Sequence, residues 1–137
     1  MKRLCAIAVT VALVAVACGD KNTGTTTAPT ATQKTENFSG TVQVNGSAVH
    51  NFTVENSGQV SVTLTAASPP ANVVMGIGVG TPGDNACGLL SGASVSTSAG
   101  SSAQLTGVVS PGMLCVKIFD VGSQTAAVAY TVTVMHP

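Results

Sequence analysis

The stretch that decides the fold reads Pro111-Gly112-Met113-Leu114-Cys115-Val116-Lys117-Ile118-Phe119-Asp120. After its Pro-Gly turn, one face holds Leu114, Val116 and Ile118, and the other holds Met113, Cys115, Lys117 and Phe119. Period-2 spacing with β-branched residues predicts a strand. Because both faces are largely apolar, we expect this strand to lie in the centre of a sheet rather than at a wet edge.

Segments with the same alternation surround this strand and are separated by turn residues. They cover 38–44, 49–54, 59–66, 73–80, 103–109 and 126–135, with a weaker candidate near 93–97. Asn45-Gly46, between the first two, is a strong signal for a hairpin. About seven or eight short strands, with no helical segment, predict an all-β fold, an antiparallel β-sandwich.

Two parts of this domain lack large side chains. Gly76, Gly78 and Gly80 leave one face of the strand 73–80 nearly bare. No lysine or helix start follows them, so they do not match a phosphate-binding loop, and we expect them to permit close packing. The region 81–102 is rich in Gly, Ser and Ala, and we expect a loose excursion there.

Charge is scarce in this chain. Charged residues make up 7% of the sequence and hydrophobic residues 45%. Without residues 1–17, three lysines remain against five acidic residues, a formal charge of −2. Because no basic patch is present in the sequence, nucleic acid is not an expected partner. The abundant Val and Thr favour pleated sheets over helices.

The N-terminus has the three parts of an export signal. Lys2 and Arg3 precede an apolar run, and small residues end it at Ala15-Val16-Ala17-Cys18. This run is shorter than the roughly 20 residues that a membrane-spanning helix needs. We therefore interpret residues 1–17 as a removable signal peptide.

The small residues directly before Cys18 resemble the lipobox of bacterial lipoproteins. The resemblance implies that Cys18 receives a diacylglyceryl group and becomes the first residue of the mature chain, which would anchor the protein to a membrane surface. Gly19, rather than an acidic residue, follows the cysteine, and this favours the outer membrane. An ordinary secretory signal, in which Cys18 is incidental, is the alternative.

Residues 18–35 form a Thr-rich segment with no apolar period. Such a segment cannot bury enough surface to offset its chain entropy, so we expect a disordered tether. Fully extended, the part from 19 to 35 would reach about 60 Å. Residues 36–137 are enough for one domain with a single core.

Three groups of residues carry a family resemblance. They are Asn51-Phe52-Thr53-Val54 with the run 58–65, the stretch 111–120, and Tyr130-Thr131-Val132-Thr133-Val134. Together they resemble the bacterial pre-peptidase C-terminal domain, and the likeness covers about 36–137. The resemblance implies a jelly-roll-like β-sandwich, of the kind often appended to secreted proteases and other exported proteins.

Cys87 and Cys115 are the two cysteines of the predicted domain, because Cys5 lies in the leader. In an oxidising compartment we expect them to pair. The bridge would tie the region 81–102 to the central strand and contribute about 3.6 kcal/mol in the chain-entropy model. A thiolate metal site or a nucleophile is the alternative, but no His-rich ligand set lies near either cysteine.

The remaining polar residues do not form a catalytic pattern. We expect a structural or surface role for His50, beside Phe52, and for His136, at a frayed terminus. No motif activates a serine as a nucleophile. The turn that holds Asp84 could offer a weak calcium site, but the sparse carboxylates favour a plain turn. We predict no catalytic residue, no bound metal and no cofactor.

These features predict a non-catalytic binding or structural module, held at the cell envelope by lipid on Cys18. Besides the membrane surface, an envelope protein or a polysaccharide is the expected partner. Carbohydrate binding is the alternative function, although sugar platforms use flat aromatic rings and the chain has no Trp, one Tyr and three Phe. An enzyme with a cryptic site is the third reading.

Overall fold

A computed structural model describes residues 31–137 of the chain. The predicted signal peptide 1–17, the lipid site Cys18 and most of the predicted tether lie outside the described residues. Between residues 31 and 137, no helix is long and apolar enough to cross a membrane.

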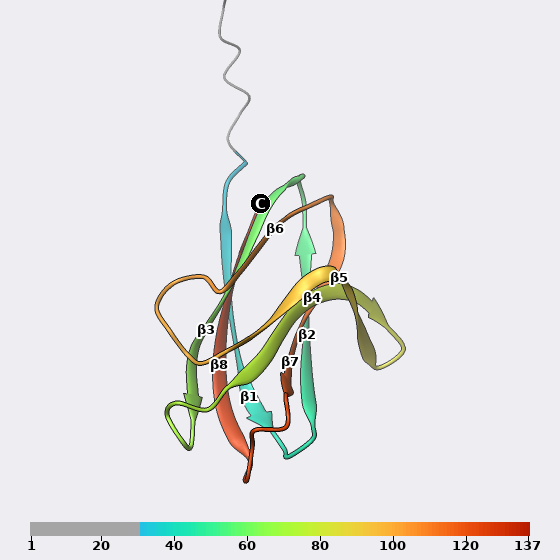
Figure 1. Ribbon diagram of the computed structural model, residues 1–137. Helices are drawn as coiled ribbons and strands as arrows, with labels where there is room; N and C mark the ends of the chain where they lie inside the picture. Colours follow the sequence, from blue (N-terminus) through green and yellow to red (C-terminus); the bar gives the residue numbers. More distant parts are fainter. Residues whose placement is uncertain (1–30) are drawn as a thin grey trace, which may run out of the picture.

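The described residues form eight strands, and every pairing between them is antiparallel. The strands are β1 (Lys34–Val42), β2 (Ser47–Val54), β3 (Gly58–Ser68), β4 (Met75–Gly83), β5 (Ala86–Thr97), β6 (Leu105–Val109), β7 (Gly112–Asp120) and β8 (Val128–His136). One sheet has the order β1-β8-β3-β6, and the other has the order β2-β7-β4-β5 (Figure 1). The predicted all-β sandwich is confirmed.

Consecutive strands alternate between the two sheets, except for the β4–β5 hairpin. This is the strand order of a jelly roll, in which two Greek keys are wound together. It leaves the edge strands β1 and β2 in contact on one side of the sandwich, and the edge strands β5 and β6 in contact on the other. We call these two openings the β1–β2 seam and the β5–β6 seam.

Alternate residues of the strands fill the space between the sheets. The buried positions are Val60, Val62 and Leu64 on β3, Met75, Ile77 and Val79 on β4, Leu114, Val116 and Ile118 on β7, and Val128, Tyr130, Val132 and Val134 on β8. All of them belong to one core cluster. Each buried aliphatic side chain contributes about 1.5–3 kcal/mol relative to an exposed one, so this shared core holds the two sheets together.

β7 lies between β2 and β4, so the prediction of a central strand is confirmed. Its inward face is the predicted one, with Leu114, Val116 and Ile118 buried in the core. Its outward face is covered in part as well, because Cys115 has no exposed surface. A strand that is covered on both faces needs apolar residues on both, which is the pattern that the sequence shows.

Three expectations are corrected by the structure. Asn45-Gly46 does not close a hairpin, because the strands on either side of this turn, β1 and β2, lie in different sheets. The region 81–102 is not mainly a loose excursion, because β5 covers 12 of its residues and pairs with β4 along most of its length. Small residues suit this arrangement, since the β5 backbone crosses close over the glycines of β4. The first strand begins at Lys34 rather than at residue 38, because its N-terminal half pairs with the end of β8.

Candidate functional site

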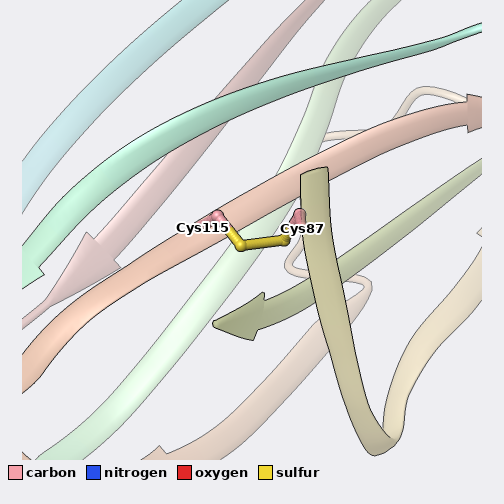
Figure 2. Close-up of a disulfide and its surroundings, with 2 residues drawn as sticks. All are labelled: Cys87 and Cys115. Atoms are coloured by element: carbon pink, nitrogen blue, oxygen red, sulfur yellow. A yellow bond between two sulfur atoms is a disulfide. The ribbon is translucent and has the colours of Figure 1, made fainter. Parts of the chain in front are cut away.

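A disulfide joins Cys87 on β5 to Cys115 on β7, as the sequence predicted (Figure 2). The S–S distance is 2.03 Å, the Cα atoms are 5.9 Å apart, and 28 positions separate the two residues in sequence. Both cysteines are buried. Because β4 lies between β5 and β7 in the sheet, the bridge links the two neighbours of β4 across its outer face.

The glycines of β4 make room for this crossing. A Cβ atom at Gly80 would meet the carbonyl of Gly88 and lie 2.9 Å from the Cα of Leu89, which are both backbone atoms of β5. A Cβ at Gly78 would lie 2.7 Å from a Leu89 methyl group, and one at Gly76 would enter the ring of Phe119. The bare face of β4 is therefore a packing surface, as the sequence predicted.

The β1–β2 seam contains His50 of β2 and Tyr130 of β8. Their side chains share a hydrogen bond of 2.7 Å between His50 Nε2 and the Tyr130 hydroxyl. The ring of Phe38 stacks on the imidazole with centroids 4.8 Å apart. Burial lowers the pKa of His50 and raises the pKa of Tyr130, so both groups are held in their neutral forms near neutral pH.

The same seam contains the second histidine, His136, whose side chain is 1% exposed. Its Nε2 donates to Glu36 Oε1 at 3.0 Å, and its ring lies 5.2 Å from the ring of Phe52. The expectation that His136 lies at a frayed terminus is wrong. β8 continues through His136 because Lys34 of β1 pairs with it.

The electrostatics of Glu36 follow from these contacts. Burial raises the pKa of its carboxyl group, but hydrogen bonds from His136 and Lys34, together with the charges of both, lower it by more. The net pKa is below the ordinary value. Lys34 contributes through an ion pair of 3.2 Å.

Two hydrogen-bonded pairs, His50 with Tyr130 and His136 with Glu36, therefore connect the strands at the β1–β2 seam. His50 was expected beside Phe52, and the structure adds Tyr130 and Glu36, which the sequence analysis did not connect with either histidine. Tyr130 and Glu36 lie on the inward faces of β8 and β1. The alignment of β1, β2 and β8 would therefore have been needed to place them beside the histidines. Among residues 31–137, no buried side-chain nitrogen or oxygen lacks a hydrogen-bond partner.

Asp120 ends β7 and connects two turns. Its Oδ1 accepts hydrogen bonds from the amides of Gly122, Ser123 and Gln124, and its Oδ2 accepts one of 2.8 Å from the amide of Asn45. The hydrogen bond from Asn45, together with those from the other three amides, lowers the pKa of the carboxyl group against a smaller opposing effect of burial. This carboxylate ties the β7–β8 loop to the turn between β1 and β2.

Asp84 lies in the turn between β4 and β5, next to Asn85 with its φ of 57°. Within the described part of the chain, no group of three or more His, Cys, Asp or Glu residues is arranged to hold a metal ion.

A cleft of about 220 Å³, lined mainly by aliphatic side chains, opens at the β5–β6 seam. Its base is formed by the buried Val60, Val62 and Val79. Leu90 of β5 and Val108 of β6 border it and are 42% and 84% exposed. No charged side chain lines the cleft among residues 31–137. The cleft could not be predicted from the sequence, because the distance between the edge strands β5 and β6 is not encoded in either strand alone.

No protein-family model matches the chain, and a search of the curated proteins finds no match either.

Proposed function

We propose that this chain is a lipid-anchored, non-catalytic binding or structural module of the bacterial cell envelope. Two parts of the sequence support the anchor. The leader ends in small residues directly before Cys18, and a Thr-rich segment separates that cysteine from the first strand. The lipid would hold the domain at a membrane, with the outer membrane favoured because Gly19 follows the cysteine.

One observation carries the non-catalytic part of the proposal. The side chains best suited to acid–base chemistry already have structural partners. His50 bonds to Tyr130, His136 bonds to Glu36, and Asp120 bonds to backbone amides. A general base must also lie within reach of a substrate proton, and the side chain of His136 is only 1% exposed. Groups that stabilise a seam and a turn are better suited to holding the fold than to proton transfer.

The proposal keeps the resemblance to the pre-peptidase C-terminal domain, which implies a jelly-roll-like sandwich, and the strand order here is that of a jelly roll. On that resemblance the chain would be an accessory module rather than an enzyme. The cleft in the β5–β6 seam favours a protein partner over a polysaccharide, because its lining is aliphatic and sugar platforms use flat aromatic rings.

Lipidation is tested by labelling growing cells with an alkyne analogue of palmitate. We expect label on the wild-type protein and on Cys5→Ala, because Cys5 would be removed with the leader. Cys18→Ala should carry no label. Label that persists on Cys18→Ala would contradict the anchor, and density-gradient separation of the wild type would assign the membrane.

The kind of partner is tested by cross-linking in intact cells, followed by a glycan array with the purified protein. We expect cross-linked envelope proteins and no glycan bound. Specific glycan binding would instead support the carbohydrate-binding alternative, and turnover of a substrate would contradict a non-catalytic module.

A further inference from the structure

The edge strand β6 has the properties of an unprotected pairing edge. It bonds to β3 on one side, and no strand of residues 31–137 bonds to its other side. Its sequence, Leu105-Thr106-Gly107-Val108-Val109, has no charge and no proline. Soluble proteins usually protect an edge with charged side chains, prolines or bulges, because unpaired backbone amides and carbonyls attract another strand.

Two of the other three edge strands, β1 and β5, carry such protection. The third, β2, is covered at the β1–β2 seam, where the ring of Phe38 stacks on His50. β1 begins with Lys34 and Glu36, which form an ion pair at the seam. β5 is interrupted by a register shift opposite Gly78 and Gly80, and Gly92 within it has a φ of 72°. β6 has neither a charged residue nor a register shift in its ladder to β3.

The side chains of β6 fit a second strand on both faces. Val108 is 84% exposed, and Thr106 lies exposed on the same outward face. Leu105 and Val109 pack partly against the core and border the cleft, with Gly107 between them. A Cβ built on Gly107 would meet no atom within 4 Å, so there is open space at the centre of the strand.

The strand is also complementary to itself. When two copies of β6 run antiparallel about Gly107, Leu105 lies opposite Val109 of the second copy. Thr106 then lies opposite Val108 of the second copy on the outward face. Aliphatic and β-branched cross-strand pairs stabilise antiparallel sheets, and neither face brings like charges together.

We propose that β6 is a dimer edge, at which a second copy of this chain pairs through its own β6. The two four-stranded sheets would become one sheet of eight strands with a two-fold axis at Gly107. The added strand would place its Leu105 and Val109 over the mouth of the cleft. A second copy of β6 would bring no charged side chain against the uncharged cleft, and the chain supplies such a strand itself.

The length of β6 sets the expected strength of the dimer. A ladder of five residues is short compared with the roughly 1,200–2,000 Å² that stable interfaces bury. We therefore expect association that depends on protein concentration.

The first test measures the mass of the full-length protein in mild detergent by analytical ultracentrifugation, from about 10 μM to about 1 mM. We expect the mass to double over this range. In Thr106→Lys/Val108→Lys, lysines would oppose one another across the axis, and we expect the doubling to be lost. The control Met113→Lys/Met135→Lys changes two exposed methionines on other strands and should still dimerise.

A protein that stays monomeric throughout, or a dimer that survives Thr106→Lys/Val108→Lys, would overturn the proposal. The second test does not depend on charge. Partner residues in antiparallel strands have Cα atoms about 4.5–5.5 Å apart, within the range that a disulfide spans. Gly107→Cys in the full chain should give a covalent dimer on non-reducing gels, and Met113→Cys should not; equal cross-linking of the two would overturn the axis at Gly107.

Discussion

The backbone of Gly88 lies so close over Gly80 that no side chain fits between β5 and β4 at this point. A Cβ on Gly80 would meet the Gly88 carbonyl and come within 2.9 Å of the Cα of Leu89. The disulfide between Cys87 and Cys115 holds the β5 backbone against the same face. The glycine, the crossing strand and the bridge therefore form one structural unit.

We predict that Gly80→Ala destabilises the domain by about 1–3 kcal/mol, because the backbone of β5 would have to move. Gly76→Ala should cost less, since only the ring of Phe119 has to swing away. Gly107→Ala serves as the control, because its new methyl group would meet no atom within 4 Å. Urea unfolding at low protein concentration measures the free energy of unfolding of each variant. Equal free energies for Gly80→Ala and Gly107→Ala would contradict the prediction.

Removing the disulfide should lower the free energy of unfolding by about 3.6 kcal/mol in the chain-entropy model. Cys87→Ser/Cys115→Ser removes the bridge, and wild-type protein in reductant should lose a similar amount. Urea unfolding of the three samples measures the loss. An unchanged midpoint in the double variant would show that the β4–β5 ladder alone holds β5 in place.

The pKa of His50 predicts a loss of stability in mild acid. Burial lowers this pKa below its ordinary value of 6.5, so the unfolded state takes up a proton first as the pH falls. The contribution of the neutral imidazole is complete above about pH 6.5 and decreases as the pH falls toward the lower pKa of the folded state. We measure the free energy of unfolding between about pH 7.5 and pH 5.5 for the wild type and for His50→Gln. The variant should show the smaller slope, and identical slopes would contradict the prediction.

Glu36 predicts a second loss at lower pH. The net pKa of its carboxyl group lies below the ordinary value of 4.5, because the hydrogen bonds and charges of His136 and Lys34 outweigh burial. Its contribution is therefore present above that ordinary value and is lost as the pH falls through the folded pKa. Glu36→Gln should weaken this acid dependence, as measured by the free energy of unfolding.

Glu55→Gln is the matched control for Glu36, because Glu55 is an exposed carboxylate in the turn after β2. Its acid dependence should resemble that of the wild type. If Glu55→Gln altered the acid dependence as much as Glu36→Gln, the contacts of Glu36 with His136 and Lys34 would not be its source.

The sequence predicted the strands best where both faces had a clear period of two. The stretch 111–120 and the run ending at Val134 are found as expected, and the bare face of 73–80 is a packing surface. The prediction from sequence failed for β5, because its small residues resemble those of a loop. The reason is that β5 is stabilised by its ladder to β4 and by the bridge at Cys87, which are contacts between distant positions.

The sequence by itself determined the fold class, because alternating side chains commit each strand to one inward face. It also determined the pairing of Cys87 with Cys115, because no other cysteine lies in the predicted domain. Only the tertiary structure decided which strands meet at each seam. That choice buried His136 against Glu36 and left β6 with an open edge beside an aliphatic cleft. These relationships depend on how the two sheets are joined, and local periodicity contains no information about residues that are distant in sequence.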